Sequence, residues 1–137
     1  MVKKNIFVMI VLILLAFSAD QSYKDGNYSA MSRGDYTGEP YYGHTRIAIE
    51  KGKIAKIEFF IRDSAKHEYM DDKYSKNFAG NAEYIQQCLN DWKGIQTYPK
   101  LLLKSQDINK VDAVTGATWS HNIFNASVEE ALAKAKK

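Results

Sequence analysis

Apolar and polar residues alternate most regularly between residues 44 and 62, and this pattern predicts two β-strands that pair as a hairpin. One strand spans residues 44–50 and the other spans residues 56–62. Lys51-Gly52 lies between them, and Gly52 supplies the positive φ that a two-residue turn requires. The side chains expected to face inward are Thr45, Ile47, Ile49, Ile57, Phe59 and Ile61.

Apolar residues recur at helical spacing in the second half of the chain. We expect Gly94 to close a first helix and Pro99 to open a short one that carries residues 101–103. The apolar stripe of the first helix consists of Phe78, Ala82, Ile85, Cys88, Leu89 and Trp92. A last helix ends in lysines, which suit the helix dipole, and its apolar face consists of Phe124, Val128, Ala131, Leu132 and Ala135.

The order of these elements indicates the fold class. A further strand is expected at residues 27–31, then a loop over residues 32–39, while residues 63–73 form a charged, irregular segment. Strands first and helices afterwards predict an α+β domain, in which an antiparallel β-sheet of hairpin or meander type packs one face against helices. The length suits one domain, residues 20–137, which begins with a short tether at residues 20–24.

The first 19 residues have the pattern of a targeting segment. Lys3 and Lys4 precede an unbroken apolar run from Ile6 to Phe17, and small residues follow. The run is shorter than the roughly 20 residues of a membrane-spanning helix, so a cleaved signal peptide is favoured over a retained N-terminal membrane anchor. We therefore expect an exported protein of the cell envelope, in the periplasm or at the outer face of the cytoplasmic membrane.

Composition argues against several classes of function. The chain has 19 Lys and Arg against 16 Asp and Glu, and two lysines lie in the targeting segment, so no basic surface for nucleic acid is expected. The single cysteine, Cys88, cannot form an internal disulfide, and a buried apolar role is favoured over a reactive thiol. Neither the nucleophile turn of serine hydrolases nor a glycine-rich dinucleotide loop is present.

Two groups of polar residues have competing interpretations. His67, Glu68, Asp71 and Asp72 lie close together and offer the nitrogen and oxygen donors of divalent metal sites. Their spacing is unspecific, so a solvated loop is favoured and no metal site is predicted. His121, one turn into the last helix, is either a cofactor contact or, more commonly for such a position, a surface histidine.

The stretch DAVTGAT, from Asp112 to Thr118, is the candidate for chemistry. Gly116 and Ala117 are small enough to let the backbone approach a bulky group. Thr118 presents a hydroxyl at the start of the last helix, where unpaired amides and the helix dipole favour an anion such as phosphate. From local chemistry alone, the common role of Thr118 or Ser120 as a helix N-cap is favoured.

The same stretch resembles the acceptor motif of flavin transferase substrates, in which an Asp is followed by Ser or Thr and then Gly-Ala-Thr. The chain as a whole resembles the FMN-binding domain family, which includes the C subunit of the sodium-translocating NADH:quinone reductase. The resemblance covers residues 25–135 and favours the flavin acceptor over the helix cap. The further segments that carry it are Asp25-Gly26-Asn27-Tyr28, Lys51-Gly52-Lys53-Ile54, Ser105-Gln106 and Val111-Asp112.

This resemblance implies a role for each matching residue. Thr118 would hold FMN through a phosphoester, and Asp112 would be read by the transferase, which takes FMN from FAD with a magnesium ion. Thr115, Gly116 and Ala117 would form the loop on the phosphate side. The chain would then be the substrate of the transferase.

The resemblance does not assign the contacts to the flavin ring. The quinone reductase subunits carry a Glu-Thr-Pro-Gly loop where residues 67–70 of this chain read His-Glu-Tyr-Met. Trp119 follows the acceptor directly and is counted among the cofactor-binding residues. The aromatic candidates for the ring are Trp119, Tyr41, Tyr42 and Phe78.

The implied function is that of an electron-transfer flavoprotein, without catalytic residues or a complete enzymatic reaction of its own. Its partners would be a flavin transferase and redox partners in the membrane or envelope. Two alternatives remain open. One is a domain that binds FMN without a covalent bond, as a store or sensor, and the other is a flavin-free interaction protein that retains the fold.

Overall fold

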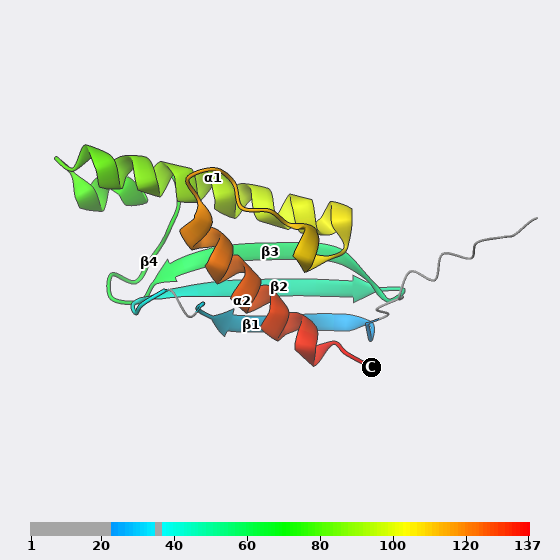
Figure 1. Ribbon diagram of the computed structural model, residues 1–137. Helices are drawn as coiled ribbons and strands as arrows, with labels where there is room; N and C mark the ends of the chain where they lie inside the picture. Colours follow the sequence, from blue (N-terminus) through cyan, green and yellow to red (C-terminus); the bar gives the residue numbers. More distant parts are fainter. Residues whose placement is uncertain (1–22, 35–36) are drawn as a thin grey trace, which may run out of the picture.

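The computed structural model describes residues 23–34 and 37–137. Its strands form one antiparallel sheet in the order β1-β2-β3-β4, which is a meander (Figure 1). The strands are β1 (Gly26–Ser32), β2 (Tyr41–Glu50), β3 (Lys53–Asp63) and β4 (Glu68–Tyr69). The helices are α1 (Ala82–Ser105) and α2 (Thr118–Lys134), with short 3-10 helices η1 (Tyr74–Phe78) and η2 (Ile108–Lys110).

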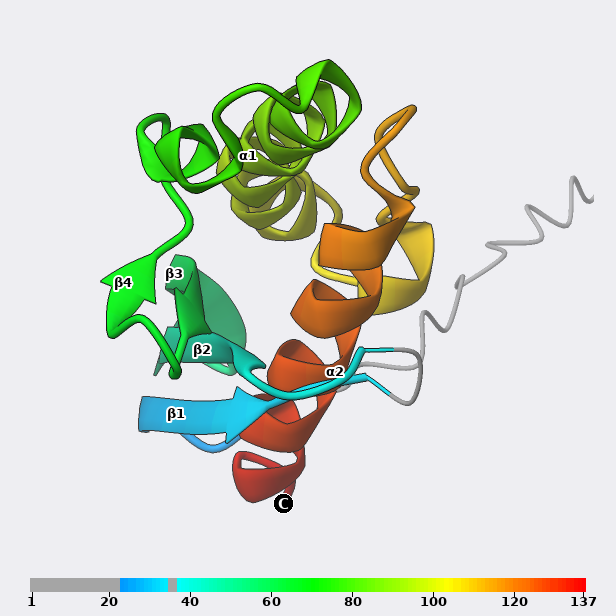
Figure 2. The same cartoon turned by 90° about the vertical axis from the view of Figure 1, so that its left-hand side faces the viewer.

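The helices cover one face of the sheet. Helix α2 packs across β1 and β2, while α1 runs along β3 (Figures 1 and 2). The opposite face exposes side chains such as Met31 and Phe60. The predicted α+β class, with one covered sheet face, is therefore confirmed.

The predicted hairpin is confirmed in its turn and in its alternation. Lys51 and Gly52 have φ values of 52° and 73°, and Ile47 pairs with Ile57. The register shifts at Ala48/Ile49, so β3 contains a bulge that the pattern did not predict. Because of this shift, Ile54 also faces the core.

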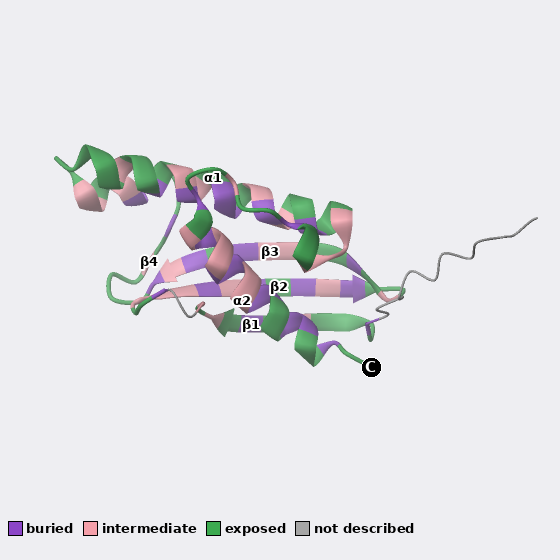
Figure 3. Cartoon of the chain, viewed as in Figure 1, coloured by how far each residue is buried: buried purple, intermediate pink, exposed green. Residues whose placement is uncertain are grey.

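The core lies between the sheet and α2, whose predicted apolar face is entirely buried (Figure 3). Phe59 of β3 meets Phe124 edge to face, with ring centroids 4.9 Å apart. Gly43 permits the close approach of α2 to β2, because a Cβ there would lie 2.6 Å from Ile123 Cγ2. Strand and helix therefore fit only with glycine at this position.

The predicted break between Gly94 and Pro99 is wrong, because α1 continues through both residues to Ser105. Gly94 is buried, and a Cβ there would lie 2.9 Å from Ser120 Oγ and 3.0 Å from Ala117 Cβ. Its function is close helix packing rather than termination. The buried face that continues past Pro99 offsets the cost of a proline inside the helix. That face consists of Cys88, Asp91, Gly94, Ile95, Tyr98 and Leu102.

The predicted apolar stripe of α1 is also partly wrong. Ala82 and Leu89 are exposed, and Phe78 belongs to η1 rather than to the helix. Asp91 lies on the buried face instead. The pattern failed here because it assigned a charged residue to the solvent side.

The start of the domain is more ordered than the predicted tether. Lys24 N–H donates to Ala135 O at 2.8 Å, and Tyr23 N–H donates to Gly52 O at 3.3 Å. These two residues are part of the fold, so the tether prediction is wrong for them. The predicted targeting segment, residues 1–19, lies outside the described residues. Within the described ranges, no helix has the length and apolar character needed to cross a membrane.

Candidate functional site

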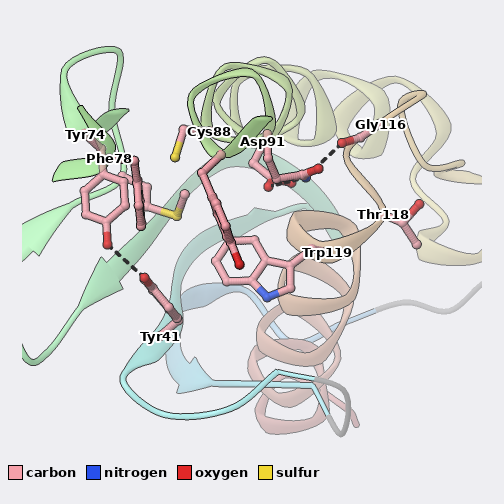
Figure 4. Close-up of a pocket in the computed structure, with 11 residues that line it drawn as sticks. Tyr41, Tyr74, Phe78, Cys88, Asp91, Gly116, Thr118 and Trp119 are labelled. Atoms are coloured by element: carbon pink, nitrogen blue, oxygen red, sulfur yellow. Dashed lines mark hydrogen bonds between the residues drawn. The ribbon is translucent and has the colours of Figure 1, made fainter. Parts of the chain in front are cut away.

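A cavity of about 540 Å³ is bounded by the start of α2, the N-terminal half of α1, η1 and the start of β2. Figure 4 shows Gly116, Thr118 and Asp91 on one side of it, and Tyr41 and Tyr74 on the other. We call the side formed by Gln87, Asp91, Gly116 and Thr118 the acceptor end. We call the side formed by Tyr41 and Tyr74 the tyrosine end. The lining residues are Tyr41, Met70, Tyr74, Phe78, Tyr84, Gln87, Cys88, Asp91, Gly116, Thr118 and Trp119.

At the acceptor end, a tight turn delivers Thr118 to the cavity. Gly116 has a φ of 80°, and a Cβ on it would lie 2.7 Å from Asn90 Nδ2. Ala117 is fully buried, and its carbonyl accepts the Tyr98 hydroxyl at 2.8 Å. The small residues of the motif are therefore required by contacts with α1.

Thr118 is the first residue of α2 and does not cap it. The N-cap is Ala117, and no side-chain hydrogen bond caps the helix. The Ser120 amide donates to Asp91 Oδ1 at 3.2 Å, and its hydroxyl donates to Ala117 O at 3.0 Å. The interpretation of Thr118 or Ser120 as an N-cap is therefore wrong. Within the described residues, the amides of Thr118 and Trp119 are the donors of the first turn that remain free.

Asp91 and Gln87 connect α1 to this turn. Gln87 Nε2 donates to Asp91 Oδ2 at 2.8 Å and to Gly116 O at 3.0 Å. Burial raises the pKa of Asp91 above its ordinary value, although the hydrogen bonds from Gln87 and Ser120 act in the opposite direction. The sequence pattern does not predict either residue, because nothing local distinguishes them from surface helix residues.

At the tyrosine end, two hydroxyl groups are linked to a buried carboxylate. Tyr74 Oη donates to Asp63 Oδ2 at 2.6 Å, and Tyr41 Oη lies 2.9 Å from Tyr74 Oη. The amides of Ala65 and Lys66 donate to Asp63 Oδ1, each at 3.0 Å. Burial alone would raise the pKa of Asp63, but these donors hold it below its ordinary value. Burial and the neighbouring Asp63 raise the pKa of Tyr74, which stays protonated.

Aromatic rings form the walls between the two ends. Trp119 meets Tyr41 edge to face at 5.1 Å, and Phe78 stacks on Tyr84 at 5.3 Å. Of the four predicted ring candidates, Tyr41, Phe78 and Trp119 line the cavity. Tyr42 does not line the cavity, and its hydroxyl donates to Glu39 at 3.1 Å. Met70, Tyr74 and Tyr84 also line the cavity, and the sequence pattern did not predict a role for them.

Asp112, Thr115 and His121 lie outside the cavity lining, whereas Cys88 is part of it. Asp112 and Thr115 are exposed on the loop before α2. His121 Nε2 lies 2.6 Å from Val111 O, so it holds this loop rather than reaching the cavity. Cys88 is buried, as predicted, and burial raises its thiol pKa.

The predicted solvated loop provides contacts within the protein. Glu68 accepts from Asn77 Nδ2 at 3.2 Å, and its carboxylate lies 3.6 Å from Lys76 Nζ. Among residues 23–34 and 37–137, no group of three or more His, Cys, Asp or Glu side chains is arranged to hold a metal ion.

Comparison with known proteins supports a flavin site. A family model described as "FMN-binding domain" matches residues 42–133. The chain is similar to the crystal structure of the CPE2226 protein from Clostridium perfringens, with a TM-score of 0.57, 26% identity, and coverage of 82% of this chain and 88% of that one. It also matches a solution structure from Clostridium thermocellum, with a TM-score of 0.48, 23% identity, and coverage of 83% and 93%. No curated protein matches.

The residues of the cavity fit FMN. The free amides at the start of α2 are suitable donors for a phosphate group. The aromatic walls and a volume of about 540 Å³ suit a planar ring system. Helix-start amides suited to a phosphate, aromatic walls and a volume of about 540 Å³ therefore occur together in one cavity.

Proposed function

The chain belongs to the FMN-binding domain family, and from this premise we propose that it is an exported electron-transfer flavoprotein with FMN covalently bound to Thr118. FMN is the cofactor, and when bound it supplies reversible uptake and release of electrons. The chain supplies attachment, orientation and tuning. It is the substrate of a flavin transferase rather than a complete enzyme.

The position of Thr118 carries this proposal. Thr118 is exposed, lines the cavity and is the first residue of a helix that has no side-chain cap. Its hydroxyl is accessible to a transferase, while the amides of Thr118 and Trp119 are available to phosphate oxygens. The exposure of Asp112 suits recognition by the transferase.

The proposed attachment transfers FMN from FAD with the help of magnesium. The Thr118 hydroxyl oxygen forms a bond to the phosphorus of the FMN half of FAD. The pyrophosphate bond to that phosphorus breaks, and AMP leaves with the bridging oxygen. The hydroxyl proton passes to the transferase or to solvent, and no group is oxidised or reduced.

Export gives covalent attachment a physical advantage. The basic and apolar pattern of residues 1–19 supports export or N-terminal anchoring. A reversibly bound cofactor would be lost by dilution outside the cytoplasm, whereas a phosphoester keeps it through each redox cycle. The proposed partners are a flavin transferase and redox proteins of the membrane or envelope.

The test is coexpression with a flavin transferase in the exporting compartment, for wild type and for Thr118→Ala. We expect a wild-type band that fluoresces on a denaturing gel and an intact mass increased by one FMN residue. Thr118→Ala should show neither. The matched control is Thr97→Ala, which removes a threonine hydroxyl outside the motif that donates to Lys93 O at 2.7 Å, and this variant should still be flavinylated.

The outcomes separate this proposal from its alternatives. A dark wild-type band whose native protein still copurifies with FMN would contradict covalent attachment and support a store or sensor. A colourless wild-type protein after exposure to FAD, magnesium and the transferase would support a flavin-free interaction protein.

A further inference from the structure

The tyrosine end of the cavity has a fixed direction of hydrogen bonding, which begins at Asp63. This side chain is buried, and its contacts are the Tyr74 hydroxyl and the amides of Ala65 and Lys66. All three contacts are donors. Asp63 therefore accepts every bond as a carboxylate and gives no proton to the tyrosines.

The single hydroxyl proton of Tyr74 is committed to Asp63 Oδ2, at 2.6 Å. Toward Tyr41, Tyr74 is then only an acceptor. The 2.9 Å contact between the two hydroxyl oxygens must therefore be donated by Tyr41. Figure 4 shows this contact at the side of the cavity opposite Gly116.

Tyr41 lines the cavity with a hydroxyl whose proton points away toward Tyr74. The lone-pair capacity that remains on its oxygen can only accept a hydrogen bond. We propose that Tyr41 Oη is a hydrogen-bond acceptor for an N–H group of the flavin ring, with Tyr74 and Asp63 as positioning residues. This inference rests on the proposed function and assigns a ring contact within it.

Two N–H groups of the ring have this chemistry. N3–H is present in both redox states, whereas N5–H exists only after reduction. An acceptor at N3 resists loss of the N3 proton, because the resulting anion would face another lone pair. An acceptor at N5 favours the reduced state. The acidity of N3 therefore reports a contact with N3–H, and the midpoint potential reports a contact with N5–H.

The experiment uses full-length protein loaded with FMN by the transferase, as wild type, Tyr41→Phe, Tyr74→Phe and the control Tyr42→Phe. Tyr42 is the neighbour of Tyr41 on β2, and its hydroxyl bonds to Glu39 instead. Intact mass confirms equal loading. The two readouts are the alkaline titration of N3–H by visible absorption and the midpoint potential of the bound flavin.

One hydrogen bond corresponds to an equilibrium constant changed about threefold to tenfold. If the partner is N3–H, Tyr41→Phe makes N3 more acidic by that factor. If the partner is N5–H, the midpoint potential falls by roughly 15–30 mV, at 29.6 mV per tenfold for a two-electron couple. Either shift supports the proposal. Tyr42→Phe should change neither quantity.

Tyr74→Phe tests whether Tyr74 fixes the direction of the hydrogen bond donated by the Tyr41 hydroxyl. It leaves the Tyr41 hydroxyl in place but frees its proton, so we expect a smaller shift in the same direction. If Tyr41→Phe matches Tyr42→Phe in both readouts, the acceptor contact is wrong. If Tyr41→Phe has an effect but Tyr74→Phe has none, the positioning by Tyr74 is wrong. If no protein, wild type included, were loaded with flavin, the proposed function itself would be contradicted.

Discussion

The two ends of the cavity each involve a buried aspartate, yet the two carboxyl groups have opposite pKa shifts. Asp63, behind the tyrosine end, accepts from three groups, and its pKa is lowered. Asp91, at the acceptor end, accepts from Gln87 and the Ser120 amide, and burial raises its pKa. Burial alone therefore does not set the direction of the pKa shift of an acid, because hydrogen-bond donors can outweigh it.

The largest expected effect comes from removing the anchor of the tyrosine end. Asp63→Ala leaves the buried Tyr74 hydroxyl and two amides without their acceptor, so we expect the free energy of unfolding to fall by about 2–4 kcal/mol. Urea denaturation measures this change. The control is Asp72→Ala at an exposed position. An equal effect of the two substitutions would show that the carboxylate does not organise this end.

A smaller effect is expected at the acceptor end, which depends on close packing. Gly94→Val places atoms where a Cβ alone would lie 2.8 Å from Tyr98 Cε2 and 2.9 Å from Ser120 Oγ. We expect the free energy of unfolding to fall by about 1–3 kcal/mol. Flavinylation of Thr118 should also slow, because Ala117 and Ser120 must shift.

The control for this packing contact is Gly38→Val, since no atom lies within 4 Å of a Cβ added at Gly38. Thermal denaturation and the time course of flavin incorporation give the two readouts. If Gly94→Val were as stable and as readily flavinylated as Gly38→Val, the close approach of α1 to the acceptor turn would be unimportant.

The smallest effect is a pH dependence at Asp91. The pKa of Asp91 is raised in the folded state, so folding favours its protonated form. The stability gained in this way is fully present below the ordinary pKa of 3.8 and is lost as pH rises through the pKa of the folded state. Asp91→Asn removes this titration. We therefore expect wild type to lose stability relative to Asp91→Asn as pH rises, by at most about 1.4 kcal/mol per pH unit.

Denaturation of both proteins across the acidic and neutral range measures the difference, in which the titrations of other groups cancel. A difference that is independent of pH would mean that Asp91 titrates as in the unfolded chain. A difference of the opposite sign would mean that its hydrogen bonds outweigh burial, as they do for Asp63.

The two ends also differ in how far the sequence predicts them. Gly116, Ala117 and Thr118 are adjacent in the chain, so their small size and the hydroxyl at a helix start are visible as a motif. Tyr41 and Tyr74 are 33 residues apart and meet only because β2 and η1 border the same cavity. Their identity as aromatic residues was visible, but their hydrogen bond was not.

By itself, the sequence determined the hairpin, its turn, the apolar face of α2 and the small residues of the acceptor motif. These features depend on neighbours in the chain or on a strict period. Only the tertiary structure decided that α1 continues past Gly94 and Pro99, that Asp91 is buried, and that Asp63 orders two tyrosines. Each of these depends on partners from distant segments, whose packing and hydrogen bonds outweigh the local preference of the residue concerned.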